Sequence, residues 1–372
     1  MKKSFVFISL TALLLFASSC ARINEPTNGQ IQLELDNVMK SSIEQYKAPG
    51  MILAVWVPGK GKYVKAMGLS DIKTGRKMQV SDRFRIGSNT KSVVATVILQ
   101  LVDRKKLSLD DKLSRFFPEW PNSNNITIRM LLDHTSGIFN YSTSEKFGEL
   151  LESDPKRPFT PRQLISYAIN EKPYFEPGKG FNYSNTNTVL LGMIIEKLTG
   201  HTLASEVKAR IFEPLGLKNT YFPVASETNG NMAHGYMFKN GKADDWTYAN
   251  PSWGWAAGAI ISNMPDLKIL ITAITDGALI SRKLQKERMS TWVELAGTAR
   301  KDFPSARYGY NVFTFGGFVG HNGGLPGYIS YMVRDPKTGI TTTMMMNTQP
   351  EGEASLEILK KVIQIILPGR KV

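Results

Sequence analysis

Apolar and polar residues alternate so that strand-like segments lie near both ends of the chain, with helices between them. Runs of apolar and β-branched residues bounded by Pro-Gly or Gly-rich turns indicate strands, and apolar residues at helical spacing indicate helices. Near the start, the pattern predicts a helix over 31–46, strands over 51–57 and 62–67, and a short strand toward Phe84. The last third predicts strands over 310–315, 318–321, 328–333 and 340–346, and a closing helix over 355–366.

The middle of the chain predicts mostly helices and loops. One helix begins at Ser88 and carries an apolar side from Val93 to Val102; others are expected over 128–133, 162–170, 186–198 and 265–274. Strands at both ends with helices between them predict an α/β (α+β) fold in which both chain ends complete one sheet. The helical middle would then form an inserted subdomain.

The first twenty residues have the pattern of an export signal. Lys2 and Lys3 precede an apolar run from Phe5 to Ala17, which is too short to span a bilayer comfortably. Small residues then lead to Cys20, the only cysteine, so no intrachain disulfide can form. This resembles a bacterial lipoprotein signal over residues 1–19, with lipidation of Cys20 and a tether over 20–30. The alternative is a plain signal peptide cut nearby. We expect an exported, periplasmic protein that is attached to a membrane by a lipid anchor.

Composition and charge narrow the range of partners. The 372 residues are 42% hydrophobic and 21% charged, which is ordinary for a globular protein. The net charge of +14 becomes +12 without Lys2 and Lys3, and the basic residues are scattered along the chain. Because no basic run or aromatic-interleaved patch is present, we expect a basic, solvated surface and no nucleic-acid partner. Attraction to an acidic cell wall or to lipid headgroups has weaker support.

Four Ser-x-x-Lys tetrads are candidates for a nucleophile and its base. A lysine three residues after a serine lies on the same helical face, where a neutral amine could accept the hydroxyl proton. Ser88 and Lys91 stand where an apolar helix begins. The other pairs are less suitable: Ser70/Lys73 lies in a turn, Ser153/Lys156 encloses a proline, and Ser205/Lys208 has no supporting context.

Two further motifs follow in order, Tyr183-Ser184-Asn185 and His321-Asn322-Gly323. The succession Ser-x-x-Lys, Tyr-x-Asn and His-x-Gly resembles the serine hydrolases related to penicillin-binding proteins and class C β-lactamases. Supporting stretches include 84–87, 131–137, 214–217 and 257–262. The resemblance covers nearly all of the mature chain and implies one β-lactamase/transpeptidase-like domain over 31–368. Its expected fold is an antiparallel sheet with flanking helices.

The resemblance, together with chemistry, assigns roles to these residues. At a helix N-terminus, the N–H of Ser88 can stabilise an oxyanion, and the resemblance places the second donor at Gly324. Lys91 and Tyr183 would share proton transfer, with the acylation base left open between them. His321 is expected to be partly charged near neutrality and to polarise the site or contact the substrate. The resemblance implies that Asn185, Gly323 and Gly324 bind the substrate.

Several motifs of similar spelling are better explained as structure. Lys73-Thr74-Gly75 and Lys337-Thr338-Gly339 have the sequence of hairpin loops, and Tyr248-Ala249-Asn250 falls in a loop before a proline. Asp133 and His134 suggest a Ser-His-Asp triad, but adjacent residues of a helix do not face each other, so both are interpreted as structural.

The sequence thus predicts an enzyme that hydrolyses an amide or ester bond through an acyl-enzyme on Ser88, with no cofactor. No metal is expected, because the four histidines lack ligand-type spacing. We favour a D,D-carboxypeptidase or D-peptidase-type amide hydrolase acting on peptidoglycan-derived substrates. An esterase or class C-like β-lactamase using the same residues is the alternative. A non-catalytic penicillin-binding or sensor protein is a second one.

Overall fold

The computed structural model describes residues 28–223 and 231–372. The predicted signal over 1–19, the lipidation site Cys20 and most of the tether therefore lie outside the described residues. Within the two described ranges, no helix is both long and apolar enough to span a membrane.

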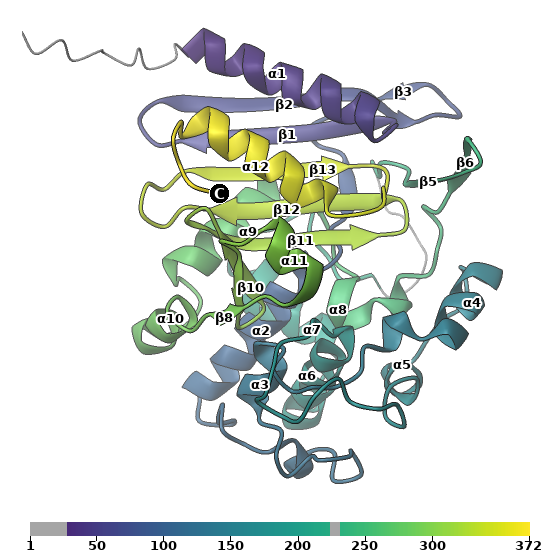
Figure 1. Ribbon diagram of the computed structural model, residues 1–372, viewed down its shortest axis with the longest axis vertical. Coiled ribbons are helices and arrows are strands. Elements are labelled where there is room, and N and C mark those ends of the chain that lie inside the picture. The colour runs from purple at the N-terminus through teal and green to yellow at the C-terminus, as the bar shows by residue number, and fades with distance from the viewer. Residues whose placement is uncertain (1–27, 224–230) are drawn as a thin grey trace, which may run out of the picture.

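One large antiparallel sheet forms the centre of the molecule (Figure 1). Its strand order is β3-β2-β1-β13-β12-β11-β10-β9-β8. These strands are β1 (Gly50–Val57), β2 (Gly61–Asp71), β3 (Arg76–Lys77), β8 (Val293–Glu294), β9 (Arg307–Gly309), β10 (Val312–Phe315), β11 (Phe318–Leu325), β12 (Tyr328–Arg334) and β13 (Thr341–Met346). Because β1 pairs with β13, the prediction that both chain ends complete one sheet is confirmed.

Helices cover both faces of this sheet. On one face α1 (Asn28–Gln45) and α12 (Ala354–Ile366) lie side by side in front of the strands (Figure 1). On the other face α2 (Asn89–Asp103) and α9 (Met264–Asp276) pack against β11, β12 and β13. Since both faces are covered, every residue of β13 is buried and the apolar side chains form two clusters, one on each side.

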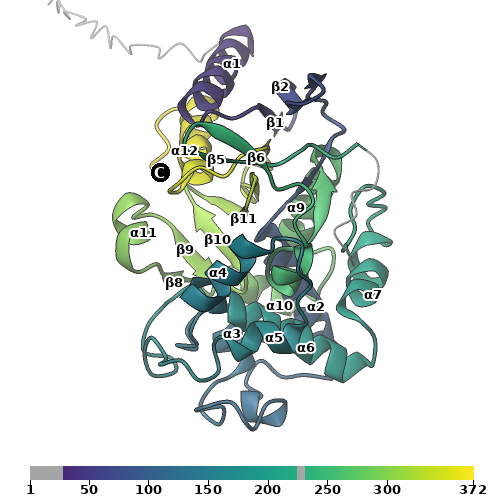
Figure 2. The ribbon, with the colours of Figure 1, turned by 90° about the vertical axis from the view of Figure 1, so that its right-hand side faces the viewer.

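The region between β4 and β8 is mostly helical, as predicted, and extends below the sheet (Figure 2). Its remaining helices are α3 (Ile128–Leu132), α4 (Glu145–Ser153), α5 (Pro161–Ser166), α6 (Asn185–Thr199), α7 (Leu203–Val207), α8 (Trp255–Gly258) and α10 (Arg282–Arg288). A further helix, α11 (Gly297–Asp302), lies between β8 and β9. Short 3-10 or π-helical turns are η1 (Leu113–Arg115), η2 (Tyr141–Thr143), η3 (Lys208–Phe212) and η4 (Pro251–Trp253). Two small sheets pair β4 (Arg83–Arg85) with β7 (Ile261–Asn263) and β5 (Tyr236–Lys239) with β6 (Lys242–Asp245).

The predicted strand over 310–315 is wrong at its start. Gly309 pairs with Val312, so Tyr310 and Asn311 form a two-residue hairpin loop between β9 and β10. Both loop residues have positive φ, 47° and 56°, as a type I′ turn requires. This turn is fully buried, and the N–H of Asn311 donates to the carbonyl of Leu132. The hairpin therefore points into the protein interior.

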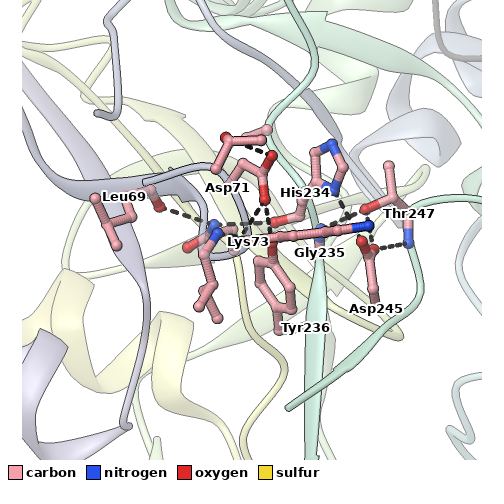
Figure 3. A network of polar contacts seen from close by, with 12 residues as sticks. Leu69, Asp71, Lys73, His234, Gly235, Tyr236, Asp245 and Thr247 are labelled. Atoms are coloured by element: carbon pink, nitrogen blue, oxygen red, sulfur yellow. Dashed lines mark hydrogen bonds and ion pairs between the residues drawn. The ribbon is translucent and has the colours of Figure 1, made fainter. Parts of the chain in front are cut away.

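A polar network fixes the segment that contains β5 and β6 to the ends of strands β1, β2 and β13 (Figure 3). Asn347 accepts from the N–H of Gly50 and donates to the carbonyls of Leu69 and His234. The Tyr236 hydroxyl donates to Asp71, and the His234 ring pairs with Asp245. Beyond β6 this segment supplies two carbonyls that accept from Arg85 on β4. It thereby supports the strand that leads to Ser88.

Candidate active site

Ser88 and Lys91 form a contact pair at the start of α2. Lys91 Nζ lies 3.0 Å from Ser88 Oγ and 2.7 Å from the carbonyl oxygen of Ala257. The lysine is fully buried, and burial holds its pKa well below that of a free lysine. A neutral amine can donate to Ala257 while its lone pair faces the hydroxyl. The geometry therefore suits Lys91 as the group that removes the Ser88 proton.

The turn before Ser88 lies directly against strand β11. Gly87 has a φ of +54°, and a Cβ placed there would lie 2.8 Å from the nitrogen of Gly324. A Cβ on Gly323 would lie 2.0 Å from the carbonyl oxygen of Ile86. Only glycines permit this approach of the two backbones. The predicted oxyanion donors, the N–H groups of Ser88 and Gly324, thus come from segments in direct contact.

Tyr183 lies beside this pair, in the extended segment before α6. Lys91 Nζ is 4.9 Å from the centre of its ring, and its hydroxyl hydrogen-bonds with Ser88. Burial raises the pKa of Tyr183, and the negative charge of Glu353 adds to this, while the bond with Ser88 opposes it. A tyrosine held in its phenol form donates a proton more readily than it accepts one. The structure therefore favours Lys91 as the acylation base and Tyr183 as a proton donor.

His321 on β11 is buried, with both ring nitrogens engaged. Nδ1 lies 2.5 Å from the carbonyl oxygen of Asn322, and Nε2 lies 2.9 Å from the Tyr308 hydroxyl. Burial, with the nearby Lys91, lowers the pKa of His321 to about 3. The prediction of a partly charged histidine is thus wrong, because a buried ring with no carboxylate partner among the described residues stays neutral. His321 forms part of the site wall.

Asn185 begins α6, close to the other predicted residues, but makes different contacts from those expected. Its side chain donates to Ser142 Oγ at 2.8 Å, and its own N–H donates to Asn140. The carbonyl oxygen of the side chain is buried and has no partner among the described residues. The described side-chain contacts of Asn185 are therefore with its neighbours in the protein, and its binding of the substrate stays a prediction.

The alternative motifs are structural, as predicted. Ser70, Ser153 and Ser205 each donate to a nearby backbone carbonyl rather than pairing with a lysine. Both Lys-Thr-Gly triplets lie in turns that connect neighbouring strands. Asp133 accepts from the N–H and hydroxyl of Thr135 and has no contact with the His134 ring among those described. A Ser-His-Asp triad is therefore excluded at this position.

Sequence reasoning missed the aromatic surroundings of Tyr183. The His134 ring stacks on Tyr183 with centroids 4.6 Å apart, and the Tyr308 ring meets it edge-on at 5.8 Å. His321 lies 6.2 Å away on another side. The structural interpretation of His134 was thus incomplete, because this residue holds one face of the candidate proton donor. Because His134 and Tyr183 are distant in the sequence, the residues around His134 gave no sign that the two rings stack.

A cavity of about 350 Å³ opens at Ser88. Gly323, Gly324, Tyr183 and His321 line it together with Ser88. Apolar side chains supply much of the remaining wall: Phe181, Leu295, Ala306, Phe313, Ile329 and Leu356. Of the lining residues, all within the described part of the chain, Glu353 is the only carboxylate and none is Lys or Arg. The arrangement can form an acyl-enzyme and offers a negative rather than a positive group to a charged substrate.

Glu353 stands just before α12, at the wall of this cavity. Asn322 Nδ2 lies 3.4 Å from its carboxylate and donates to Ser355 Oγ at 3.1 Å. Glu353 remains exposed to solvent, but the protein around its carboxyl group still raises the pKa through partial burial. The negative charges of Asp302 and Glu357 raise it further, against the hydrogen bond from Asn322. A cation bound next to the Glu353 carboxylate would lower this pKa again. No group of acidic, histidine or cysteine side chains in the described ranges could hold a metal ion.

Comparison with known proteins relates this site to a family. The Beta-lactamase family model matches residues 35–363. Penicillin-binding protein 4* of Bacillus subtilis is 28% identical over 89% of this chain and 75% of its own length. Esterase EstB of Burkholderia gladioli is 33% identical over half of each chain.

Solved structures give the same relation. A D-stereospecific amidohydrolase from Streptomyces superimposes with a TM-score of 0.81 and 28% identity, covering 91% of this chain and 99% of its own. The D-amino acid amidase of Ochrobactrum anthropi superimposes with a TM-score of 0.80 and 26% identity. The match covers 92% of this chain and 99% of that chain. Fold, motif order and site geometry agree with these matches: the chain belongs to the β-lactamase family and is a serine hydrolase of the superfamily that includes the penicillin-binding proteins.

Proposed function

We propose that this enzyme hydrolyses amide bonds of D-amino-acid derivatives that carry a free amino group. The observation that carries this proposal is the charge of the cavity: Glu353 lines it, and no described lining residue is a Lys or Arg. A carboxylate in a partly enclosed cavity stabilises an ammonium group by a charge-assisted hydrogen bond. The same cavity repels a substrate carboxylate.

The reaction follows from the contacts at Ser88. Ser88 Oγ attacks the amide carbon as Lys91 Nζ takes the hydroxyl proton, and the N–H groups of Ser88 and Gly324 stabilise the oxyanion. Tyr183 supplies a proton to the leaving nitrogen, because its raised pKa keeps it a phenol. The same groups then activate water, which releases the acid and restores Ser88.

Two of the similar structures support the choice of amide and of D-configuration. Their names describe a D-stereospecific amidohydrolase and a D-amino acid amidase, and both align over nine-tenths of this chain. The prediction of a D-peptidase-type amide hydrolase is therefore retained as a proposal for hydrolysis of D-amino-acid amides. The D,D-carboxypeptidase version is less favoured, because a terminal substrate carboxylate would find Glu353 rather than a cation. The esterase is the second candidate, supported by the similarity to EstB.

Ammonia release from D-phenylalanine amide, its L-enantiomer and N-acetyl-D-phenylalanine amide tests the proposal. We expect turnover of the free D-amide, and loss of most of it when the amine is acetylated. A diacetylated D-Ala-D-Ala peptide, a p-nitrophenyl ester and nitrocefin represent the competing activities. Ester turnover without release of ammonia from any amide would overturn the proposal in favour of an esterase. Ser88→Ala is the control for each activity.

Glu353→Gln separates recognition from chemistry. We expect KM for the free D-amide to rise about tenfold, as one partly solvated charge pair is lost, with kcat little changed. For the acetylated amide, KM should not change, since it has no ammonium group. In the wild type, KM for the free amide should rise as the pH falls through the raised pKa of Glu353.

We further propose that the protein is exported and anchored by a lipid on Cys20. The support is the basic start, the short apolar run and the single cysteine after small residues. Mass spectrometry of the N-terminal peptide from cells would show a lipid-modified Cys20. An unmodified chain that starts at another residue would instead support a plain signal peptide. Cys20→Ala should release the protein from the membrane fraction.

A further inference from the structure

We propose that one end of the molecule binds a membrane surface and takes an acyl chain of an anionic phospholipid into a cavity beside α1. This cavity measures about 530 Å³ and shares no lining residue with the cavity at Ser88. Its volume lies within the range of small-molecule sites, about 300–1,000 Å³. The proposal goes beyond the hydrolytic function and does not depend on it.

The walls of this cavity are mostly apolar. The start of α1, strand β1 and the end of α12 supply much of them: Ile31, Leu35, Val55, Val57, Ile366 and Leu367. Leu35 and Val55 are buried, whereas the other four are only partly covered by the protein. Removing this partly exposed surface from water against a hydrocarbon chain is favourable in proportion to its area.

The charged groups at the cavity are two lysines. Lys60 and Lys62 line it from the β1–β2 turn and are exposed, and no lining residue, all of them in the described ranges, is Asp or Glu. On α1, Glu34 does not line the cavity, and Asp36 is paired with Lys65. An anionic phospholipid matches this arrangement, with its acyl chain in the apolar part and its phosphate at the lysines.

The surface around the cavity is basic as well. The register brings the β1–β2 and β12–β13 turns to one end of the sheet, and Figure 1 shows the start of α1 and the C-terminus at the same end. Segments 58–62, 335–339 and 368–372 carry five basic side chains and one acidic side chain, Asp335, which is buried and paired with Arg370. Each Lys or Arg near an anionic bilayer raises affinity about fivefold.

This end is also where the chain enters the domain. Helix α1 begins at Asn28, and Ile31 and Leu35 in its first two turns line the cavity. Cys20 precedes Asn28 by eight residues, which span at most about 29 Å when fully extended. A lipid on Cys20 would therefore keep the basic end close to the bilayer.

The Ser88 cavity lies toward the other end of the strands. Strand β11 starts at the basic end, where Val319 pairs with Arg334, and finishes where Leu325 pairs with Tyr328. Gly324, which lines the Ser88 cavity, stands next to that finish. Binding through the basic end would therefore hold the catalytic residues away from the bilayer, toward substrates in solution.

Photolabelling from vesicles tests the proposal on the whole protein as cells produce it. Phosphatidylcholine vesicles contain either phosphatidylglycerol or phosphatidylcholine with a diazirine on one acyl chain, and peptide mass spectrometry locates the adducts. We expect adducts within 31–35, 55–63 and 366–367, at least fivefold more from phosphatidylglycerol, and fewer in 1 M salt. Adducts confined to residues before Asn28, or equal labelling from both lipids, would overturn the proposal.

Lysine pairs at the two ends of β2 test the role of charge. Lys60→Gln combined with Lys62→Gln should lower labelling of the cavity about 25-fold, fivefold for each lysine. Lys73→Gln combined with Lys77→Gln removes two exposed lysines at the opposite end of β2 and should leave labelling unchanged. Any lipid on Cys20 is the same in both proteins. Equal labelling of the two double variants would contradict a phosphate site at the cavity.

Ile366→Gln tests the apolar part. Because this side chain is partly exposed, the variant should fold, and labelling of the cavity should fall about tenfold. Ile269→Gln, at a residue 42% exposed on α9, is the matched control. Labelling of Ser88 by a fluorophosphonate should be unchanged in every variant, which reports a folded enzyme. If Ile366→Gln bound lipid like the control, the cavity would not hold an acyl chain.

Discussion

Gly87→Ala should separate the two halves of the oxyanion site. The new Cβ would lie 2.8 Å from the nitrogen of Gly324 and 3.0 Å from the carbonyl carbon of Gly323, whereas ordinary contacts begin at 3.4 Å. Both neighbours are backbone atoms of a central sheet strand, so the turn before Ser88 must move by about 0.6 Å. A hydrogen bond of about 2.9 Å would be stretched to about 3.5 Å, where little of it remains.

The expected loss follows from this displacement. Loss of one oxyanion donor lowers rates by about 10²–10³-fold, and a partial displacement should lower them by about 10–100-fold. The rate of Ser88 labelling by a fluorophosphonate measures this without knowledge of the natural substrate. The positive φ of +54° should also lower the free energy of unfolding by about 1–2 kcal/mol, measured by urea titration.

Gly75→Ala provides the matched control. Gly75 has a similar φ of +70°, but nothing lies within 4 Å of its Cβ position. This variant should show a similar loss of stability and an unchanged labelling rate. If Gly87→Ala labelled as fast as Gly75→Ala, the contact between the Gly87 turn and β11 would have no part in catalysis.

Further predictions concern the buried polar groups. Lys91→Met should abolish labelling of Ser88 without lowering the melting temperature at pH 7, because an apolar chain replaces a buried amine. The folded state holds the pKa of Lys91 below its unfolded value, so fewer protons are bound when folded, and wild-type stability should rise with pH relative to Lys91→Met. The slope should approach 1.4 kcal/mol per pH unit between the folded pKa and about 10.4, and a flat difference would refute a neutral Lys91. Asn347→Ala should lower the free energy of unfolding by about 3 kcal/mol in a urea titration, since three backbone groups lose their partner.

The fold could be predicted from the sequence where the apolar residues of a segment follow one clear helical or strand-like spacing. The long buried helices α2 and α6 and the strands β12 and β13 were located within one or two residues, because each segment is bounded by turn residues or by a polar cap. The hairpin at Tyr310 and Asn311 was missed because an aromatic residue rarely adopts a positive φ, and its burial hides the usual polar signature of a turn. Asn311 was the available signal, since asparagine favours that conformation.

The site was predictable as far as its motifs extend. Ser88, Lys91, Tyr183 and His321 do come together: Ser88, Tyr183 and His321 line one cavity, and Lys91 contacts Ser88. The charge states could not be predicted, since they depend on burial and on partners distant in the chain. Tyr308 lies on a three-residue strand, and Glu353 follows a loop, so neither belongs to a recognisable pattern. Only the assembled sheet shows that both line the cavity that contains Ser88.

The pairing of β1 with β13 has a consequence for how the enzyme comes into being. Met51 on β1 pairs with Met346 on β13, so β1 stays without this neighbour until the last strand of the chain has been synthesised. Until then β1 presents an open edge, and such long-range pairing is slow to form. The segments that carry Ser88 and Gly324 are likewise far apart in the sequence and meet only in the folded protein. A nascent chain therefore has no partial activity, and hydrolysis begins only when the last strands join the sheet.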